Sequence, residues 1–137
     1  MKKLLFIVLS ITFISCNQTA NNSGVVQNND TKSAVVVKLA DSYLAGDFNI
    51  ARDYFTADGK HYFNNLEFDV NGIIEGYNSH SLIFKDIKHN DRKVYTGYFN
   101  DGSVQTFHDF NWSAKSIITG KEYNYPTHCR WIWEEDK

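Results

Sequence analysis

Apolar residues in the first half of the chain recur at the spacing of amphipathic helices. Over residues 33–45 they stand three or four positions apart, which places them on one face of a helix. A second helix is predicted after Asp47, a residue type that caps helices, and a third over residues 70–84, capped by Asp69. Residues 60–64 are a short strand candidate.

The second half of the chain follows a period of two, which is typical of strands. After a turn at Asp91, residues 93–99 read as one strand, and the turn signal at 100–102 leads into a long strand at 103–118. A turn at Thr119–Gly120 then precedes a second long strand at 121–133. Helices followed by consecutive antiparallel strands predict an α+β domain.

The first sixteen residues, MKKLLFIVLSITFISC, have the pattern of an export signal. Two lysines precede an apolar run at residues 4–14, which is too short to cross a bilayer. The ending FISC resembles the lipobox of bacterial lipoproteins, with Phe13 where leucine is usual. This resemblance implies cleavage after residue 15 and lipidation of Cys16. The alternative is an ordinary secretory signal with a chance cysteine.

These signals divide the chain into three parts. Residues 1–15 are the predicted lipoprotein signal peptide, and residues 16–32 are the lipidated cysteine with a polar, asparagine-rich tether that cannot bury enough apolar surface to fold. Residues 33–137 are the predicted domain. The protein is thus expected to be exported and anchored by Cys16 to a membrane of the bacterial cell envelope. Cys129 would then lack a partner in the chain and is predicted to be a buried thiol.

Composition excludes several classes of partner. Lysine and arginine number 14 against 16 acidic residues, without a basic run, so nucleic acid is not an expected partner. The histidines show no compact ligand spacing, and the chain has no glycine-rich phosphate loop, so neither a metal nor a cofactor is expected. Aromatic residues reach 15%, which favours a β-rich core or an aromatic-lined cavity.

The order of elements resembles the NTF2-like superfamily, and more narrowly its SnoaL-like members. The resemblance covers residues 33–137 and rests on the segment YLAGDFNIARDYF, on the helix after Asp69, and on the tail from Trp112 to Lys137 with its W-x-W-E-x-D-K ending. It implies a cone in which three N-terminal helices pack on a strongly bent antiparallel sheet. The family's final strand would begin near Lys137, so either the sheet ends one strand short or the encoded sequence continues.

Strand alternation answers whether the neighbours His108 and Asp109 form a catalytic pair. If Thr119–Gly120 is a two-residue loop, His108 pairs with Trp131 and Asp109 pairs with Arg130 across the two long strands. Consecutive side chains of a strand point to opposite faces. His108 and Asp109 therefore cannot act together.

One face of the two long strands is aromatic and the other is polar. If the aromatic face is turned inward, a small ligand could bind in a cavity. The candidate ligand contacts are Tyr43, Tyr62, His108, Trp112, Tyr125 and Trp131. The alternative is that His108 is a core histidine bonded to a helix residue such as Tyr43.

If the polar face is turned inward instead, Asp109 and His128 could transfer a proton. The resemblance to ketosteroid-isomerase-like relatives implies a buried carboxylate that acts as the base. The competing interpretation is a cross-strand ion pair between Asp109 and Arg130 on an outer or dimer-facing surface.

Three functional hypotheses follow. The leading one is an anchored NTF2-like domain that binds a small, partly apolar molecule and has no catalytic activity. The second is an enzyme resembling SnoaL-like cyclases or ketosteroid isomerases, which would abstract a proton next to a carbonyl. The third is a structural module that forms homodimers through its sheet.

Overall fold

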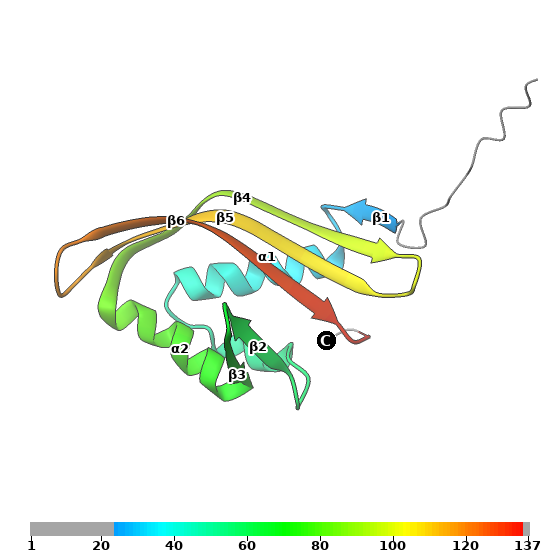
Figure 1. Ribbon diagram of the computed structural model, residues 1–137, viewed down its shortest axis with the longest axis horizontal. Coiled ribbons are helices and arrows are strands. Elements are labelled where there is room, and N and C mark those ends of the chain that lie inside the picture. The colour runs from blue at the N-terminus through cyan, green and yellow to red at the C-terminus, as the bar shows by residue number, and fades with distance from the viewer. Residues whose placement is uncertain (1–23, 136–137) are drawn as a thin grey trace, which may run out of the picture.

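A long, bent antiparallel sheet covers two helices and a small hairpin (Figure 1). The computed structural model describes residues 24–135. The elements in chain order are β1 (Gly24–Gln27), α1 (Thr31–Leu44), the 3-10 helix η1 (Asn49–Asp53), β2 (Lys60–Phe63), β3 (Leu66–Asp69), α2 (Val70–Ile83), β4 (Phe84–Phe99), β5 (Val104–Ser116) and β6 (Glu122–Trp133). The main sheet has the order β1-β4-β5-β6, and β2 pairs with β3 in a separate hairpin.

Both α-helices begin at an aspartate that caps them. Asp30 accepts a hydrogen bond from the backbone amide of Ser33 at 2.9 Å, and Asp69 accepts one from the backbone amide of Gly72 at 2.7 Å. Each bond satisfies an amide that has no partner within its helix. The predicted first and third helices are confirmed as α1 and α2, and the cap at Asp69 is the one that the sequence indicates.

The predicted cone with three N-terminal helices is wrong in its helix count. The described residues contain two α-helices, and the segment after Asp47 forms only the five-residue 3-10 helix η1. Gly46, which follows the C-cap of α1, has a φ of 81° and so prevents the helix from continuing. A second turn closes at Gly59. A helix confined between these turns is too short to gain much from propagation. One 3-10 turn is enough to bury Phe48 and Ala51.

β4 is longer than predicted and carries the bend of the sheet. It begins at Phe84, directly after α2, and its register with β5 shifts between Lys85 and Lys88 and again between Asn90 and Lys93. Asp91, where the sequence predicts a turn, has a φ of 54° inside the second shift. Such bulges bend a strand without ending it, which explains why the pattern reads as a turn.

The sheet also includes part of the segment that the sequence assigns to the tether. Gly24–Gln27 forms β1 and pairs with the end of β4, with Gly24 opposite Phe99. The predicted signal peptide and Cys16 lie outside the described residues. Within residues 24–135, no helix combines the length and apolar character needed to cross a membrane.

The register of β5 and β6 differs from the predicted one by two residues. His108 faces Cys129, because the connection between the strands is a four-residue loop over 117–120 rather than a two-residue turn. A shift of two residues keeps every side chain on its predicted face but changes its partner. Within the described part of the chain, β6 pairs with β5 alone and forms an edge of the sheet.

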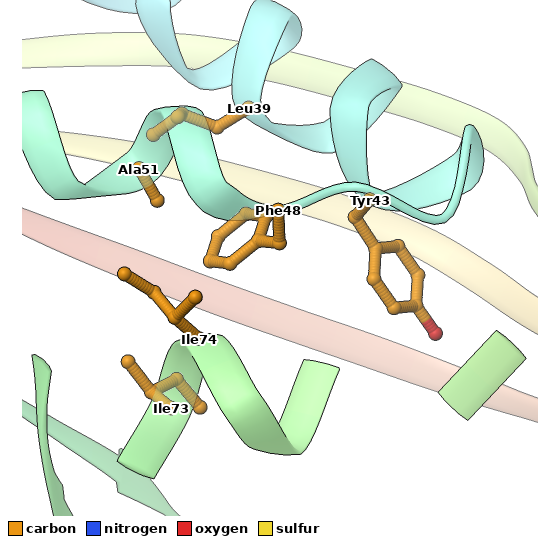
Figure 2. Close-up of a cluster of buried hydrophobic side chains, with 6 residues drawn as sticks. All are labelled: Leu39, Tyr43, Phe48, Ala51, Ile73 and Ile74. Atoms are coloured by element: carbon orange, nitrogen blue, oxygen red, sulfur yellow. The ribbon is translucent and has the colours of Figure 1, made fainter. Parts of the chain in front are cut away.

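The hydrophobic core joins the helices beneath the sheet. Figure 2 shows side chains of α1, η1 and α2 directed toward one another. The cluster consists of Leu39, Tyr43, Phe48, Ala51, Ile73 and Ile74. Trp112 of β5 and Trp131 of β6 pack against it from the sheet, so the helices cover the aromatic face of the two long strands.

Candidate functional site

The packing of the helices against the sheet shows which face of β5 is turned toward the interior. His108 is 3% exposed and Phe110 is 8% exposed, whereas Asp109 lies on the opposite face together with His128. The aromatic face therefore lines the interior, as one of the two sequence interpretations expected. Asp109 and His128 line the outer surface of the sheet.

Tyr43 holds α1, α2 and β5 together through its hydroxyl. The Trp112 indole N–H donates to this oxygen at 2.9 Å, and the oxygen lies 2.9 Å from Nδ1 of His80. Its ring also stacks on His89, with the centroids 5.3 Å apart. Since these partners occupy Tyr43, the hydrogen bond that the sequence suggested between Tyr43 and His108 is not formed.

The imidazole rings of His108 and His89 lie side by side in the interior. In each ring, one nitrogen makes no hydrogen bond with a described residue. Their ring centroids are 5.3 Å apart, and both rings pack on Phe110. Nε2 of His108 and Nδ1 of His89 are buried and have no partner among the described residues. Burial lowers the pKa of His108 to about 4 and that of His89 to about 3. Both imidazoles are therefore neutral at neutral pH.

The predicted ligand contacts separate into two groups. Tyr43, His108, Trp112 and Trp131 belong to the interior, where Trp131 packs against Phe55 of the segment after η1 with centroids 5.8 Å apart. Tyr62 on the hairpin and Tyr125 on β6 are 60% and 52% exposed. The structure does not bring all six residues to one surface.

Two shallow hollows of the described residues lie away from most of these rings. The larger, the outer groove, measures about 430 Å³ and is open to solvent. Its lining residues are Asp91, Lys93, Asp109, Phe110, Asn111, Pro126, Thr127 and His128. The smaller measures about 160 Å³ and lies where the end of α1 meets the start of β4, beside Tyr43 and Phe84. Neither hollow is lined by His108, Trp112 or Trp131.

Asp109 and His128 form a hydrogen-bonded pair in the lining of the outer groove. They stand directly opposite each other on β5 and β6, and Nδ1 of His128 is hydrogen-bonded to Oδ1 of Asp109. The Tyr95 hydroxyl donates to Oδ2 of the same carboxylate at 3.2 Å. The predicted ion pair between Asp109 and Arg130 is wrong, because the longer loop places Arg130 opposite Phe107.

The groove keeps Asp109 ionised. The hydrogen bond from His128, with a smaller contribution from Tyr95, holds the pKa of the Asp109 carboxyl below its ordinary value. Lys93 faces Asp109 from β4, on the other side of β5. The carboxylate thus serves as an acceptor and orients the imidazole, whose Nε2 remains for a further contact.

Sequence reasoning missed the residues that β4 adds to the groove. The bulge between Asn90 and Lys93 carries Asp91, whose carboxylate lies 3.5 Å from the Asn111 amide. The Asn90 side chain fixes this bulge by donating to the backbone oxygen of Asn111 and to the Ser113 hydroxyl. The signal for the bulge was the cluster of polar residues at 89–93, which we interpreted from the sequence as a turn at Asp91.

Within residues 24–135, no group of three or more histidine, cysteine or acidic side chains is arranged to hold a metal ion. Comparison with protein families, with curated proteins and with solved structures gives no match for this chain.

Proposed function

We propose that this protein is a binding module that holds a small polar molecule in the outer groove. The groove's volume of about 430 Å³ is within the range of small-ligand sites. Its polar lining includes carboxylates, an ammonium group, an amide and an imidazole. A ligand that offers both a hydrogen-bond donor and a hydrogen-bond acceptor fits this lining, for example a molecule that carries a hydroxyl or amino group beside a carboxylate.

The hydrogen bond between Asp109 and His128 carries the proposal. Tyr95 fixes the carboxylate from one side and His128 fixes it from the other. Phe107 packs against the imidazole, with centroids 5.9 Å apart. A polar pair that is already oriented loses little conformational entropy when a ligand binds.

Exposure and charge favour binding over catalysis. The side chains of His128 and Asp109 are 58% and 38% exposed, so water reaches both groups. A general base next to a carbonyl works best when burial raises its pKa toward the working pH. The pKa of Asp109 is shifted in the opposite direction.

The second candidate is acid–base catalysis by His128, and the same hydrogen bond favours it. A carboxylate at Nδ1 fixes the tautomer of the ring and leaves Nε2 as the base. Proton abstraction next to a carbonyl is the reaction class that such a base would serve. Turnover of a bound molecule separates this candidate from simple binding.

A ligand-observed NMR screen tests the proposal. The full chain is mixed with amino acids, hydroxy acids and sugars, and any compound that binds is titrated against three variants. Asp109→Asn and His128→Gln should each weaken binding by about tenfold, the effect of losing one good hydrogen bond. Arg130→Gln, on the same face of β6 but outside the groove lining, is the matched control. Equal weakening in all three variants would contradict the assignment.

We further propose that Cys16 anchors the protein to the cell envelope. The lysine pair, the apolar run and the FISC ending of residues 1–16 support this placement. Cys16→Ser should move the protein from the membrane fraction to the soluble fraction. A variant that still sediments with membranes would contradict the anchor.

A further inference from the structure

Four exposed aliphatic side chains form an apolar tip at one end of the molecule. The end of α2 and the loop between β5 and β6 meet at this end, on the left of Figure 1. The apolar tip consists of Leu82, Ile83, Ile117 and Ile118, which are 76%, 40%, 51% and 79% exposed. Single exposed leucines are ordinary, but a group of this kind marks an interaction surface.

The backbone fixes the two halves of the tip together. The amide of Ile117 donates to the carbonyl oxygen of Ile83 at 2.9 Å. The next residues, Phe84 and Ser116, are paired in the β4–β5 ladder. The two apolar segments, far apart in sequence, therefore form one surface whose shape is set by the sheet.

Lysines flank the segments of the tip along the chain. Lys85 and Lys115 are direct partners across β4 and β5. Lys121 follows the loop, and its ammonium group lies 5.1 Å from the centroid of the Tyr123 ring. Like charges at directly opposed positions of a sheet are destabilising. An arrangement that brings lysines together beside exposed aliphatic groups indicates an anionic partner.

The charge of this end differs from that of the chain. Three lysines and two carboxylates, those of Asp86 and Glu122, flank the tip, and Glu122 is paired with Lys115 at 3.3 Å. These five flanking residues together carry +1, whereas the whole chain carries −2, so the rest of the chain carries −3. The positive end is the apolar end.

We propose that the apolar tip enters the surface of an anionic lipid bilayer. The aliphatic side chains of the tip would enter the boundary between headgroups and acyl chains. The lysines would lie at the level of the lipid phosphates, where each basic residue adds attraction. Tyr123 lies beside Lys121, and tyrosine is a residue type that is enriched at membrane interfaces. No residue of the tip belongs to the outer groove, so this inference is independent of the proposed function.

A bilayer fits the tip better than a second copy of the chain does. In a contact between two identical tips, the lysines of one copy would face the lysines of the other. Such like-charge contacts oppose association. An anionic bilayer satisfies the aliphatic groups and the lysines together.

Spin-label depth measurements on the full chain in vesicles test the proposal. One label is placed at Ile118→Cys in the tip and a control label at Asp101→Cys, in the turn at the opposite end of β5. Two vesicle preparations are compared, phosphatidylcholine alone and phosphatidylcholine with phosphatidylglycerol in equal parts. Both labels are placed in a Cys16→Ser background, because Gly24 pairs with Phe99, two residues from Asp101, and a lipid anchor would hold the control label near the membrane. Thermal unfolding verifies that each variant is folded.

The expected result is that the label at 118 loses contact with a water-soluble nickel relaxant in the anionic vesicles, while the label at 101 keeps it. Replacing Lys85, Lys115 and Lys121 together by glutamine should restore that contact. Equal nickel accessibility at both positions would overturn the proposal. Equal burial in both kinds of vesicle would overturn the role of the lysines, and a label immobilised without vesicles in a concentration-dependent way would identify self-association instead.

Discussion

The hydroxyl groups of Thr96 and Thr106 lie 2.8 Å apart, and neither residue has exposed surface. They join β4 to β5 on the face of the sheet that packs against α1. The Trp133 indole N–H donates to Thr106 at 2.8 Å, and the Ser33 hydroxyl lies 2.9 Å from that of Thr96, which also donates to Asp30 at 3.1 Å. This polar chain runs from β6 through β5 and β4 to the cap of α1, and it holds the sheet to the helix.

Thr106→Val should therefore lower the free energy of unfolding by about 1–3 kcal/mol, the cost of leaving buried polar groups without partners. The variant removes one acceptor from Trp133 and one partner from Thr96. Urea unfolding followed by tryptophan fluorescence measures the change. Thr127→Val, at a half-exposed position of β6, is the matched control and should have a smaller effect. An equal loss of unfolding free energy in the two variants would show that the buried hydroxyl chain does not stabilise the fold more than an exposed hydroxyl does.

Tyr43→Phe should destabilise the fold by about 1–3 kcal/mol, because the lost hydroxyl leaves the Trp112 indole and His80 without a shared partner. The ring and its packing remain, so the change isolates the hydroxyl. Chemical denaturation measures the difference. Tyr62→Phe, on the exposed hairpin, should change stability little, and a comparable loss there would contradict this role for Tyr43.

The buried pair of His89 and His108 should make the protein sensitive to acid. Their pKa values are lowered by burial to about 3 and about 4, from an ordinary value of 6.5. Below pH 6.5 the unfolded chain binds protons that the folded chain excludes. Stability from this source is complete above pH 6.5 and falls as the pH drops toward 3, by at most about 1.4 kcal/mol per pH unit for each histidine.

His108→Phe tests this acid sensitivity. The variant removes a proton site and an imidazole nitrogen that has no partner, so stability at pH 7 should stay within about 1 kcal/mol or rise. Between pH 6 and pH 4 its stability should fall less steeply than that of the parent. Unfolding curves across this range give the slopes, and identical slopes would exclude His108 as a source of the pH dependence.

Cys129 should react slowly with thiol reagents in the folded protein. Burial raises the pKa of its thiol to about 11 from 9.0, which by itself reduces the reactive thiolate about 100-fold. In a Cys16→Ser background, reaction should accelerate when the protein is unfolded. A thiol placed at the exposed neighbour, Ile132→Cys, is the control and should react at once. Cys129 is half-buried rather than fully buried as predicted, and rapid reaction in the folded protein would show that its thiol is accessible.

His128→Asn should raise the pKa of the Asp109 carboxyl toward its ordinary value of 3.8, because His128 is the main cause of its lowered pKa. Carboxyl carbon chemical shifts across an acid titration measure this change. Tyr95→Phe should produce a smaller shift in the same direction, since Tyr95 contributes less. No shift in either variant would mean that the hydrogen bonds in the groove do not persist in solution.

Local patterns predicted the elements that depend on nearby residues. Asp69 as a cap fixes the start of α2, and the alternation of β5 and β6 separates aromatic from polar side chains in the way the sequence indicates. The predicted register between β5 and β6 was wrong by two residues. This error changed the cross-strand partner of each residue but not the face of the sheet on which its side chain lies. It nevertheless replaced Arg130 by His128 opposite Asp109, and thereby changed an expected ion pair into a hydrogen-bonded pair in the groove lining.

The sequence by itself determined the α+β class, the helices α1 and α2, the cap of α2 at Asp69, and the division of the long strands into an aromatic and a polar face. These features depend on side-chain period and on capping, which act over a few residues. The tertiary structure alone decided that η1 is a single 3-10 turn, that β4 bends through bulges, and that the aromatic face packs against the helices. Packing against distant segments selects among local conformations of similar energy, and strand partners depend on loop length, which alternation does not reveal.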